Sequence, residues 1–491
     1  MRRLSLLAGA LALALAGLAS AQAVFIDNAR VHTAGPAGTL ENGDVLITDG
    51  IITAVGRELA PPPGALSIDA KGQPLTPGLF AGLTALGLEE ISAESSTVHN
   101  ALGAPAPHVH PGETRWRPEF DVLPAFNPRS QVIGVNRLEG LTFTVLAPGA
   151  LEQGSFVTGQ GGAVRLDGRF DALVEGSRSL FIDLGSGAVA ASGGSRAGQY
   201  MLLDQAIREA RPAPSPMMMV SPGHGLLTPA GREAMSRYLR GGRVVFMVDR
   251  AADIRQVIRL GQQYGFQPVV AGGAEAWVVA EELAAARVPV LLDALVNLPG
   301  NFDQLGARLD NAAKLHAAGV TIAFTQSGDA THNARKIRQL AGVAAANGLP
   351  WEAALAGLTA NPARIFGIEG RLGSIEVGKV ADLVLWNGDP LEVTTTATQV
   401  FVGGRAVPMQ SRQTLLRDRY LAPKGMLPRQ YPAAGGRENG GADATGIQPT
   451  LSTIEQSRAI LRVVVDAMAP AMNAGQSVQG GLSPCAAPID R

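Results

Sequence analysis

Two histidines spaced two residues apart are the clearest potential metal ligands in this sequence. His108 and His110 flank Val109 in a Pro-rich stretch. Side chains two apart on an extended backbone point the same way, so both imidazoles could reach one ion. Zinc commonly takes three or more protein donors, and no third ligand is identifiable from the sequence. There are therefore two interpretations of this stretch: a zinc site at His108 and His110, or a solvated loop without a metal.

Three other side chains could move a proton. Asp249 follows the β-branched run 243–248, and Asp329 and His332 follow the run 320–326. Active-site residues of (β/α)8 barrels lie at the carboxyl ends of the strands, which makes these three the candidate acids or bases. The alternatives are an ion pair of Asp249 with Arg250 and an exposed His332 at a helix start.

The order of strands and helices predicts how these side chains are positioned. Residues 24–77 read as β-structure, with a tight hairpin at Asp49-Gly50. From residue 78 to 370, short β-branched runs alternate with amphipathic helices such as 251–265, a pattern typical of a (β/α)8 TIM-like barrel. Residues 371–408 return to β-structure, so we expect a small β-sandwich built from 24–77 and 371–408.

The two ends of the chain have a different composition. Arg2 and Arg3, an Ala/Leu-rich run and small residues up to Ala23 predict a signal peptide over 1–23, and hence a periplasmic or secreted protein with no membrane span. A C-terminal extension over 409–432 precedes a flexible tail, 433–491, with a possible helix at 453–471.

Composition excludes several classes of function. The formal net charge is −1, with 41 basic and 42 acidic residues, which argues against a nucleic-acid surface. Cys485 is the only cysteine, so an internal disulfide and a cysteinyl metal site are excluded. The Gly-rich stretches 159–162 and 185–195 lack a phosphate-loop signature, and we expect the second to be a flexible loop over the barrel. Glu89 and Glu90 are expected to form a solvated helix start.

Several motifs resemble the amidohydrolase superfamily, and its imidazolonepropionase-like branch in particular. They are IDAKGQPLTPGL, NPRSQVIGVNRLEGLTFTVLAPG, TANPARIFGI and EGRLGSIEVGKVADLVLWNGDP, and the resemblance runs from about Val24 to Pro432. It implies a distorted (β/α)8 barrel with a split β-sandwich. It also implies hydrolysis of amide or similar carbon–nitrogen bonds by metal-activated water.

The resemblance also identifies where the metal ligands would lie on the first barrel strand. The family has an Asp followed by a His-any-His pair, and PGLFAGLTA places Ala81, Leu83 and Ala85 at these positions. None of the three side chains offers a lone pair to an ion.

The remaining ligand positions have changed in the same way. Met247 stands at the fifth-strand His, Trp277 at or beside the sixth-strand His, and Gln326 at the eighth-strand Asp. A thioether is a poor zinc ligand, an indole only donates, and a carboxamide cannot serve as a base. We therefore expect Leu83, Ala85, Met247, Trp277 and Gln326 to converge as a vestigial metal site.

These observations predict an exported, catalytically degenerate amidohydrolase that holds no metal and binds a small molecule, peptide or partner at the barrel mouth. The first alternative is an active hydrolase, with zinc at His108 and His110 or with a metal-free site at Asp249, Asp329 or His332. The second is a non-catalytic subunit that pairs with an active paralogue, or a homo-oligomer.

Overall fold

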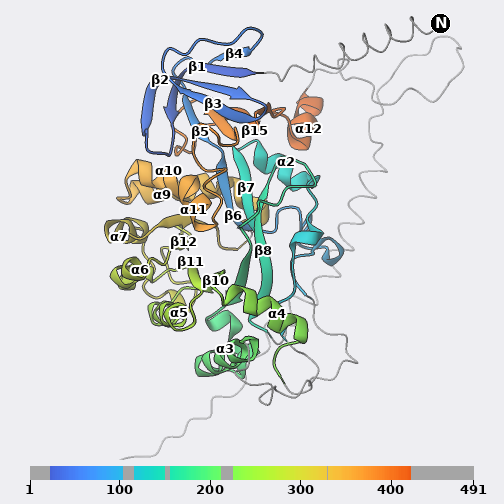
Figure 1. Cartoon of the computed structure of the whole chain (residues 1–491), viewed down its shortest axis with the longest axis vertical. Helices are drawn as coiled ribbons and strands as arrows, with labels where there is room; N and C mark the ends of the chain where they lie inside the picture. The colour runs from blue at the N-terminus through green and yellow to red at the C-terminus, as the bar shows by residue number, and fades with distance from the viewer. Residues whose placement is uncertain (1–22, 103–115, 150–154, 212–224, 329, 422–491) are drawn as a thin grey trace, which may run out of the picture. The chain divides into compact units, whose positions relative to one another are not determined.

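The computed structural model describes residues 23–102, 116–149, 155–211, 225–328 and 330–421 (Figure 1). The predicted signal peptide, up to residue 22, and the tail 433–491 lie outside the described residues. Within the described ranges, no helix combines the length and the apolar composition needed to cross a membrane.

The first sheet is built from strands of both halves of the chain (Figure 1). It runs β16-β15-β14-β5-β1-β2-β3, with β4 paired to β1. The hairpin predicted at Asp49-Gly50 is present, because both residues have a positive φ and Thr48 pairs with Ile51. The strands are β1 (Val24–His32), β2 (Thr39–Thr48), β3 (Ile51–Gly56), β4 (Leu66–Asp69), β5 (Pro74–Pro77), β14 (Leu383–Trp386), β15 (Ala397–Val402) and β16 (Arg405–Ala406).

The second sheet is the predicted barrel. Its order is β6-β7-β8-β9-β10-β11-β12-β13, and the backbone N–H of Leu83 in the first strand donates to Thr325 Oγ1, next to the last strand, at 3.1 Å. The eight strands thus form a nearly closed ring. They are β6 (Leu79–Thr84), β7 (Leu141–Leu146), β8 (Val157–Arg165), β9 (Ser179–Asp183), β10 (Arg243–Val248), β11 (Gln267–Gly272), β12 (Val290–Leu292) and β13 (Ile322–Phe324).

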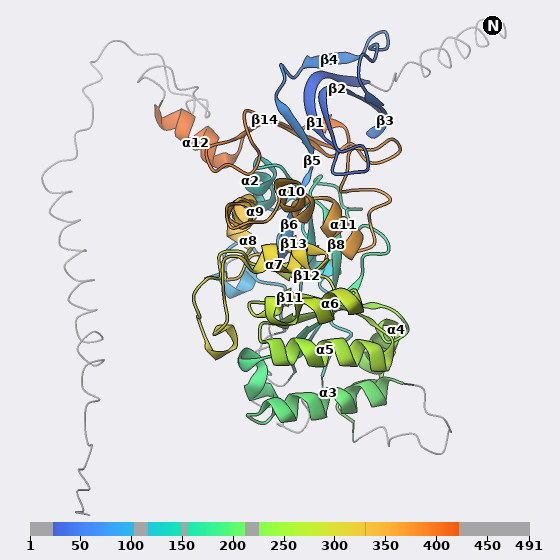
Figure 2. The ribbon, with the colours of Figure 1, turned by 90° about the vertical axis from the view of Figure 1, so that its left-hand side faces the viewer.

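Helices follow most of the strands and cover the outside of the ring. In α5, Ile254, Val257, Ile258 and Gly261 are buried at the spacing of one helix face. Figure 2 shows α3, α5, α6 and α7 following one another along this side. The α-helices are α2 (Gln131–Arg137), α3 (Arg196–Ala210), α4 (Pro229–Tyr238), α5 (Ala251–Tyr264), α6 (Ala280–Ala286), α7 (Asn311–Ala317), α8 (Ala330–Asn333), α9 (Ile337–Ala346), α10 (Trp351–Leu358), α11 (Ala360–Ile365) and α12 (Arg412–Leu421).

The two Gly-rich stretches form regular structure. Residues 157–165 form β8, which runs antiparallel to both β7 and β9, whereas the other neighbours in the ring are parallel. Residues Ser186–Ser192 form a 3-10 helix, η4, instead of a flexible loop. Close packing explains the glycines of β8, because a Cβ on Gly161 would lie 1.9 Å from the carbonyl oxygen of Leu146.

Candidate functional site at the barrel mouth

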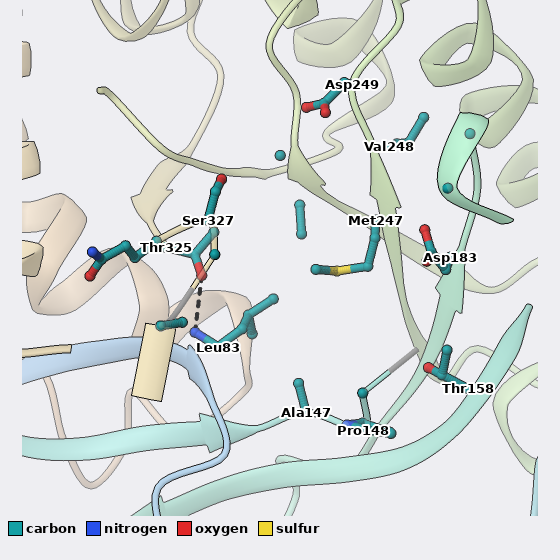
Figure 3. A pocket seen from close by; sticks show the side chains of 18 of the residues that line it. Leu83, Ala147, Pro148, Thr158, Asp183, Met247, Val248, Asp249, Thr325 and Ser327 are labelled. Atoms are coloured by element: carbon teal, nitrogen blue, oxygen red, sulfur yellow. Dashed lines mark hydrogen bonds between the residues drawn. The ribbon is translucent and has the colours of Figure 1, made fainter. Parts of the chain in front are cut away.

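A cavity of about 680 Å³ opens at the carboxyl ends of the barrel strands, and we call it the mouth cavity (Figure 3). Several barrel strands contribute residues to the cavity lining, each from its carboxyl end. The lining includes Leu83 from β6, Asp183 from β9, Met247 from β10, Ala271 from β11, and Thr325 just after β13. Barrel active sites lie at this end of the strands. The mouth cavity is therefore the candidate functional site.

A bulge in β6 positions the first of these side chains. Gly82 has a φ of +91°, and the pairing of β6 with β7 shifts register between Phe80 and Leu83. A left-handed backbone at this point favours glycine. After the bulge, Leu83 and Ala85 line the mouth cavity, as the vestigial-site hypothesis expects. Ala81 instead lies in the hydrophobic core with 1% of its surface exposed, and is not part of the lining.

Met247 is the most exposed apolar side chain that β10 presents to the mouth cavity. It is 36% exposed, although its neighbours Phe246 and Val248 are buried. Figure 3 shows its thioether reaching toward the middle of the cavity. In the barrel register, Met247 lies beside Asp183 of β9 on one side and Ala271 of β11 on the other. The sixth-strand position next to Met247 is therefore Ala271, a residue with no donor atom in its side chain.

Asp183 is a residue of the cavity lining that was not predicted from the sequence. Its carboxylate ends β9 and lies beside Met247 in the mouth cavity (Figure 3). Burial and, to a lesser extent, the negative charge of Asp249 together raise the pKa of Asp183 from 3.8 to about 6. No hydrogen bond or ion pair joins this carboxylate to another described residue. A polar residue at the end of the predicted run 179–185 was the signal that could have identified it.

Asp249, a predicted candidate, also lines the mouth cavity. Gln304 Nε2 donates to one of its oxygens at 2.8 Å, and the backbone N–H of Ala274 to the other at 3.1 Å. Burial nevertheless holds the pKa of Asp249 above its ordinary value, against these two hydrogen bonds. The expected ion pair with Arg250 is wrong, because the Arg250 guanidinium faces Asp253 instead, at 3.4 Å.

A third carboxylate of the cavity lining is paired with an arginine side chain. Asp303 accepts a hydrogen bond from the Arg196 guanidinium, which also binds Asp253. The backbone N–H of Ser186, at the start of η4, donates to Asp303 at 2.7 Å. Although burial acts to raise its pKa, the hydrogen bonds from Arg196 and Ser186 hold the pKa of Asp303 below the ordinary value. Asp303 is thus a paired anion that fixes the position of η4.

The fourth carboxylate of the lining is Glu89, which lies beside His332. Glu89 lines the mouth cavity with 13% of its side chain exposed, so its expected place in a solvated helix start is wrong. His332 Nε2 lies 3.6 Å from Glu89 Oε1. His332 is not among the described residues that line the cavity.

Trp277 does not belong to the site, which corrects the vestigial assignment. It lies in η6 (Ala276–Val279), beyond the end of β11, and its indole N–H donates to the Gly306 carbonyl at 2.8 Å. The guanidinium of Arg308 covers its ring, 4.7 Å from the centroid. Gln326 does line the mouth cavity, with its amide oxygen buried and without a hydrogen-bond partner among the described residues.

Three sequence candidates lie outside the described residues: His108, His110 and Asp329. The structure therefore places neither the alternative zinc site nor the third predicted acid. The relocated sites that depend on them stay predictions.

The donors described in the mouth cavity do not fit a zinc centre of the family's kind. Leu83 and Ala85 present only carbon to the cavity, and Met247 presents a thioether. Among the described residues, no group of three or more His, Cys, Asp or Glu side chains is placed to share an ion. A zinc site needs several such donors at about 2 Å from one point.

Comparisons with known proteins agree with the architecture. A family model described as "Amidohydrolase family" matches residues 228–408. The crystal structure of an amidohydrolase from Thermotoga maritima MSB8 superimposes with a TM-score of 0.68 at 24% identity, covering 79% of this chain and 100% of that chain.

Two curated relatives match shorter stretches. The amidohydrolase tasK of Hapsidospora irregularis is 48% identical over 59 residues, which is 12% of this chain and 6% of the relative. The imidazolonepropionase of Maricaulis maris (strain MCS10) is 37% identical over 106 residues, which is 20% of this chain and 25% of the relative. The matched stretches thus span a quarter or less of these relatives' lengths. The motifs, the family model over residues 228–408 and the barrel together support the assignment of this chain to the amidohydrolase superfamily.

Proposed function

We propose that this protein binds a small organic molecule in the mouth cavity and does not carry out metal-dependent hydrolysis. The observation that carries the proposal is the convergence of Leu83, Ala85 and Met247 on one cavity at the carboxyl ends of the strands. The family resemblance puts metal-binding imidazoles at these three positions. Apolar side chains in their place avoid the cost of burying unpaired polar groups.

The size of the cavity supports a small ligand. A volume of about 680 Å³ falls within the range of pockets that enclose drug-sized molecules. The signal-like N-terminus supports export, so we include a periplasmic or secreted location in the proposal. An interaction with an active paralogue remains a further proposal, tested by co-purification.

Metal analysis of the purified full-length protein tests the proposal. We expect far less than one zinc per chain, and no chelator-sensitive turnover of cyclic amides or dipeptides. About one zinc per chain, removed by a chelator together with hydrolytic activity, would overturn the proposal.

Asp249 supports one alternative, a metal-free hydrolase. Its carboxyl group lines the cavity, and its pKa is raised toward the range useful to a general acid or base. The discriminating variant is Asp249→Asn. Turnover of a cyclic amide that survives chelator treatment and disappears in Asp249→Asn would favour this alternative over the binding protein.

A further inference from the structure

The mouth cavity is lined by four carboxylates and, among the described residues, by no Lys, Arg or His side chain. The proposed function already makes this cavity the binding site, and the carboxylates decide only which ligand charge it accepts. The four are Glu89, Asp183, Asp249 and Asp303.

Two of the four carboxylates have a basic side chain beside them. Arg196 binds Asp303, and His332 lies beside Glu89. The other two do not have such a partner among the described residues. Asp249 receives hydrogen bonds from an amide side chain and from a backbone N–H, both uncharged.

Among the four carboxylates, the charge of Asp183 is the least compensated by its surroundings. No described residue gives its carboxylate a hydrogen bond or an ion pair, although the residue is half-buried at the end of β9. Buried charges in proteins are normally paired, because an unpaired charge in a medium of low polarity is costly. A cation supplied by a ligand would provide the missing partner.

The surroundings of Asp183 favour an organic cation over a metal ion. Met247 lies next to it in the barrel register, Ala271 lies beyond Met247 on β11, and Leu83 lines the same cavity. These side chains offer an apolar surface for a carbon skeleton, whereas a metal ion needs further donors around it.

We propose that the mouth cavity binds a small organic cation whose ammonium group pairs with Asp183 and whose apolar part packs against Met247 and Leu83. This inference rests on the proposed function, since it names the class of ligand for that cavity. The proposal excludes carboxylate and phosphate ligands, which would face Asp183 and Asp249 with like charge.

Three probes of one size and different charge test this inference: benzylammonium, benzyl alcohol and benzoate, titrated calorimetrically into the full chain at pH 7.5. We expect benzylammonium to bind at least about tenfold more tightly than benzyl alcohol, and benzoate not to bind. Asp183→Asn should lower the benzylammonium affinity to that of the alcohol. Asp171→Asn is the matched control, because it removes the same charge from an exposed site and should leave the affinity unchanged.

Equal affinities for benzylammonium and benzyl alcohol, tighter binding of benzoate, or an unchanged affinity in Asp183→Asn would overturn the inference. The first two outcomes would still leave a metal-free binding cavity, so the proposed function would stand. Binding of none of the probes also overturns the inference, and metal content then decides the proposed function separately. Circular dichroism of both variants shows whether a lost affinity reflects a lost fold.

Discussion

At the scale of single residues, Asp183 has a consequence for stability as well as for binding. Its pKa in the folded chain, about 6, is above the ordinary value of 3.8. The folded state therefore binds this proton more tightly than the unfolded state does. Its contribution to the free energy of unfolding is fully present below about pH 4 and is lost as the pH rises through about 6. A shift of about two units corresponds to a penalty of about 3 kcal/mol at neutral pH.

Replacing this carboxylate by a neutral amide should remove that penalty. We expect Asp183→Asn to raise the free energy of unfolding at pH 7.5 by about 1–3 kcal/mol, and to change it little at pH 4. Urea unfolding at the two pH values measures both quantities. Asp171→Asn, on the exposed surface, should stay within about 0.5 kcal/mol of the native protein at each pH. A gain of the same size at both pH values would contradict the burial of the Asp183 charge.

At the scale of elements, the ends of β6 and β10 bring together the three positions at which the family resemblance implies metal-binding histidines. Leu83 and Ala85 follow the Gly82 bulge, and Met247 lies near the end of β10. Side chains spaced two apart on a strand share a face, so two imidazoles at 83 and 85 would again point into the mouth cavity. Substitution at three positions would then place three imidazoles in the mouth cavity.

The triple variant Leu83→His, Ala85→His, Met247→His tests this arrangement. We expect it to take up about one zinc per chain, since three imidazoles form a common catalytic zinc site. Unfolding should become easier by about 1–3 kcal/mol, because Leu83 loses its apolar burial. The matched control carries Trp277→His in place of Met247→His, and should take up none, since Trp277 lies outside the cavity. Equal zinc uptake by the two variants would contradict the convergence of Met247 with Leu83.

Local periodicity was enough to predict most of the barrel strands, because β-branched runs such as 243–248 and 320–326 are unambiguous. It did not predict β8, whose glycines at 159, 161 and 162 allow close packing against neighbouring strands but give no hydrophobic alternation.

The site was predicted in part for a similar reason. Leu83, Ala85, Met247, Asp249 and Gln326 line one cavity because the ends of barrel strands meet at one face. Trp277 was misplaced because no motif marked where β11 ends, and it lies five residues beyond that strand's last residue, Gly272. Asp183 and Asp303 escaped notice, since their burial and partners depend on contacts between distant segments.

At the scale of the whole described chain, each half contributes a block of strands to both sheets, and the two blocks pair with each other in each sheet. In the first sheet β5 pairs with β14, and Trp386 Nε1 donates to Thr76 Oγ1 at 2.9 Å. In the barrel β9 pairs with β10 along five residue pairs. Either half alone would leave unpaired strand edges in both sheets, which favours aggregation.

Because these strand pairs join the two halves, we expect the polypeptide to reassemble when it is divided between α3 and α4. Co-expressed segments 23–211 and 225–421 should copurify as a complex, whereas each segment expressed singly should be insoluble. The variant Thr76→Val, which removes the acceptor of the Trp386 indole, should reduce the yield of the complex. A soluble monomeric half would contradict this mutual dependence, and successful complementation would allow the two halves of the binding cavity to be labelled independently.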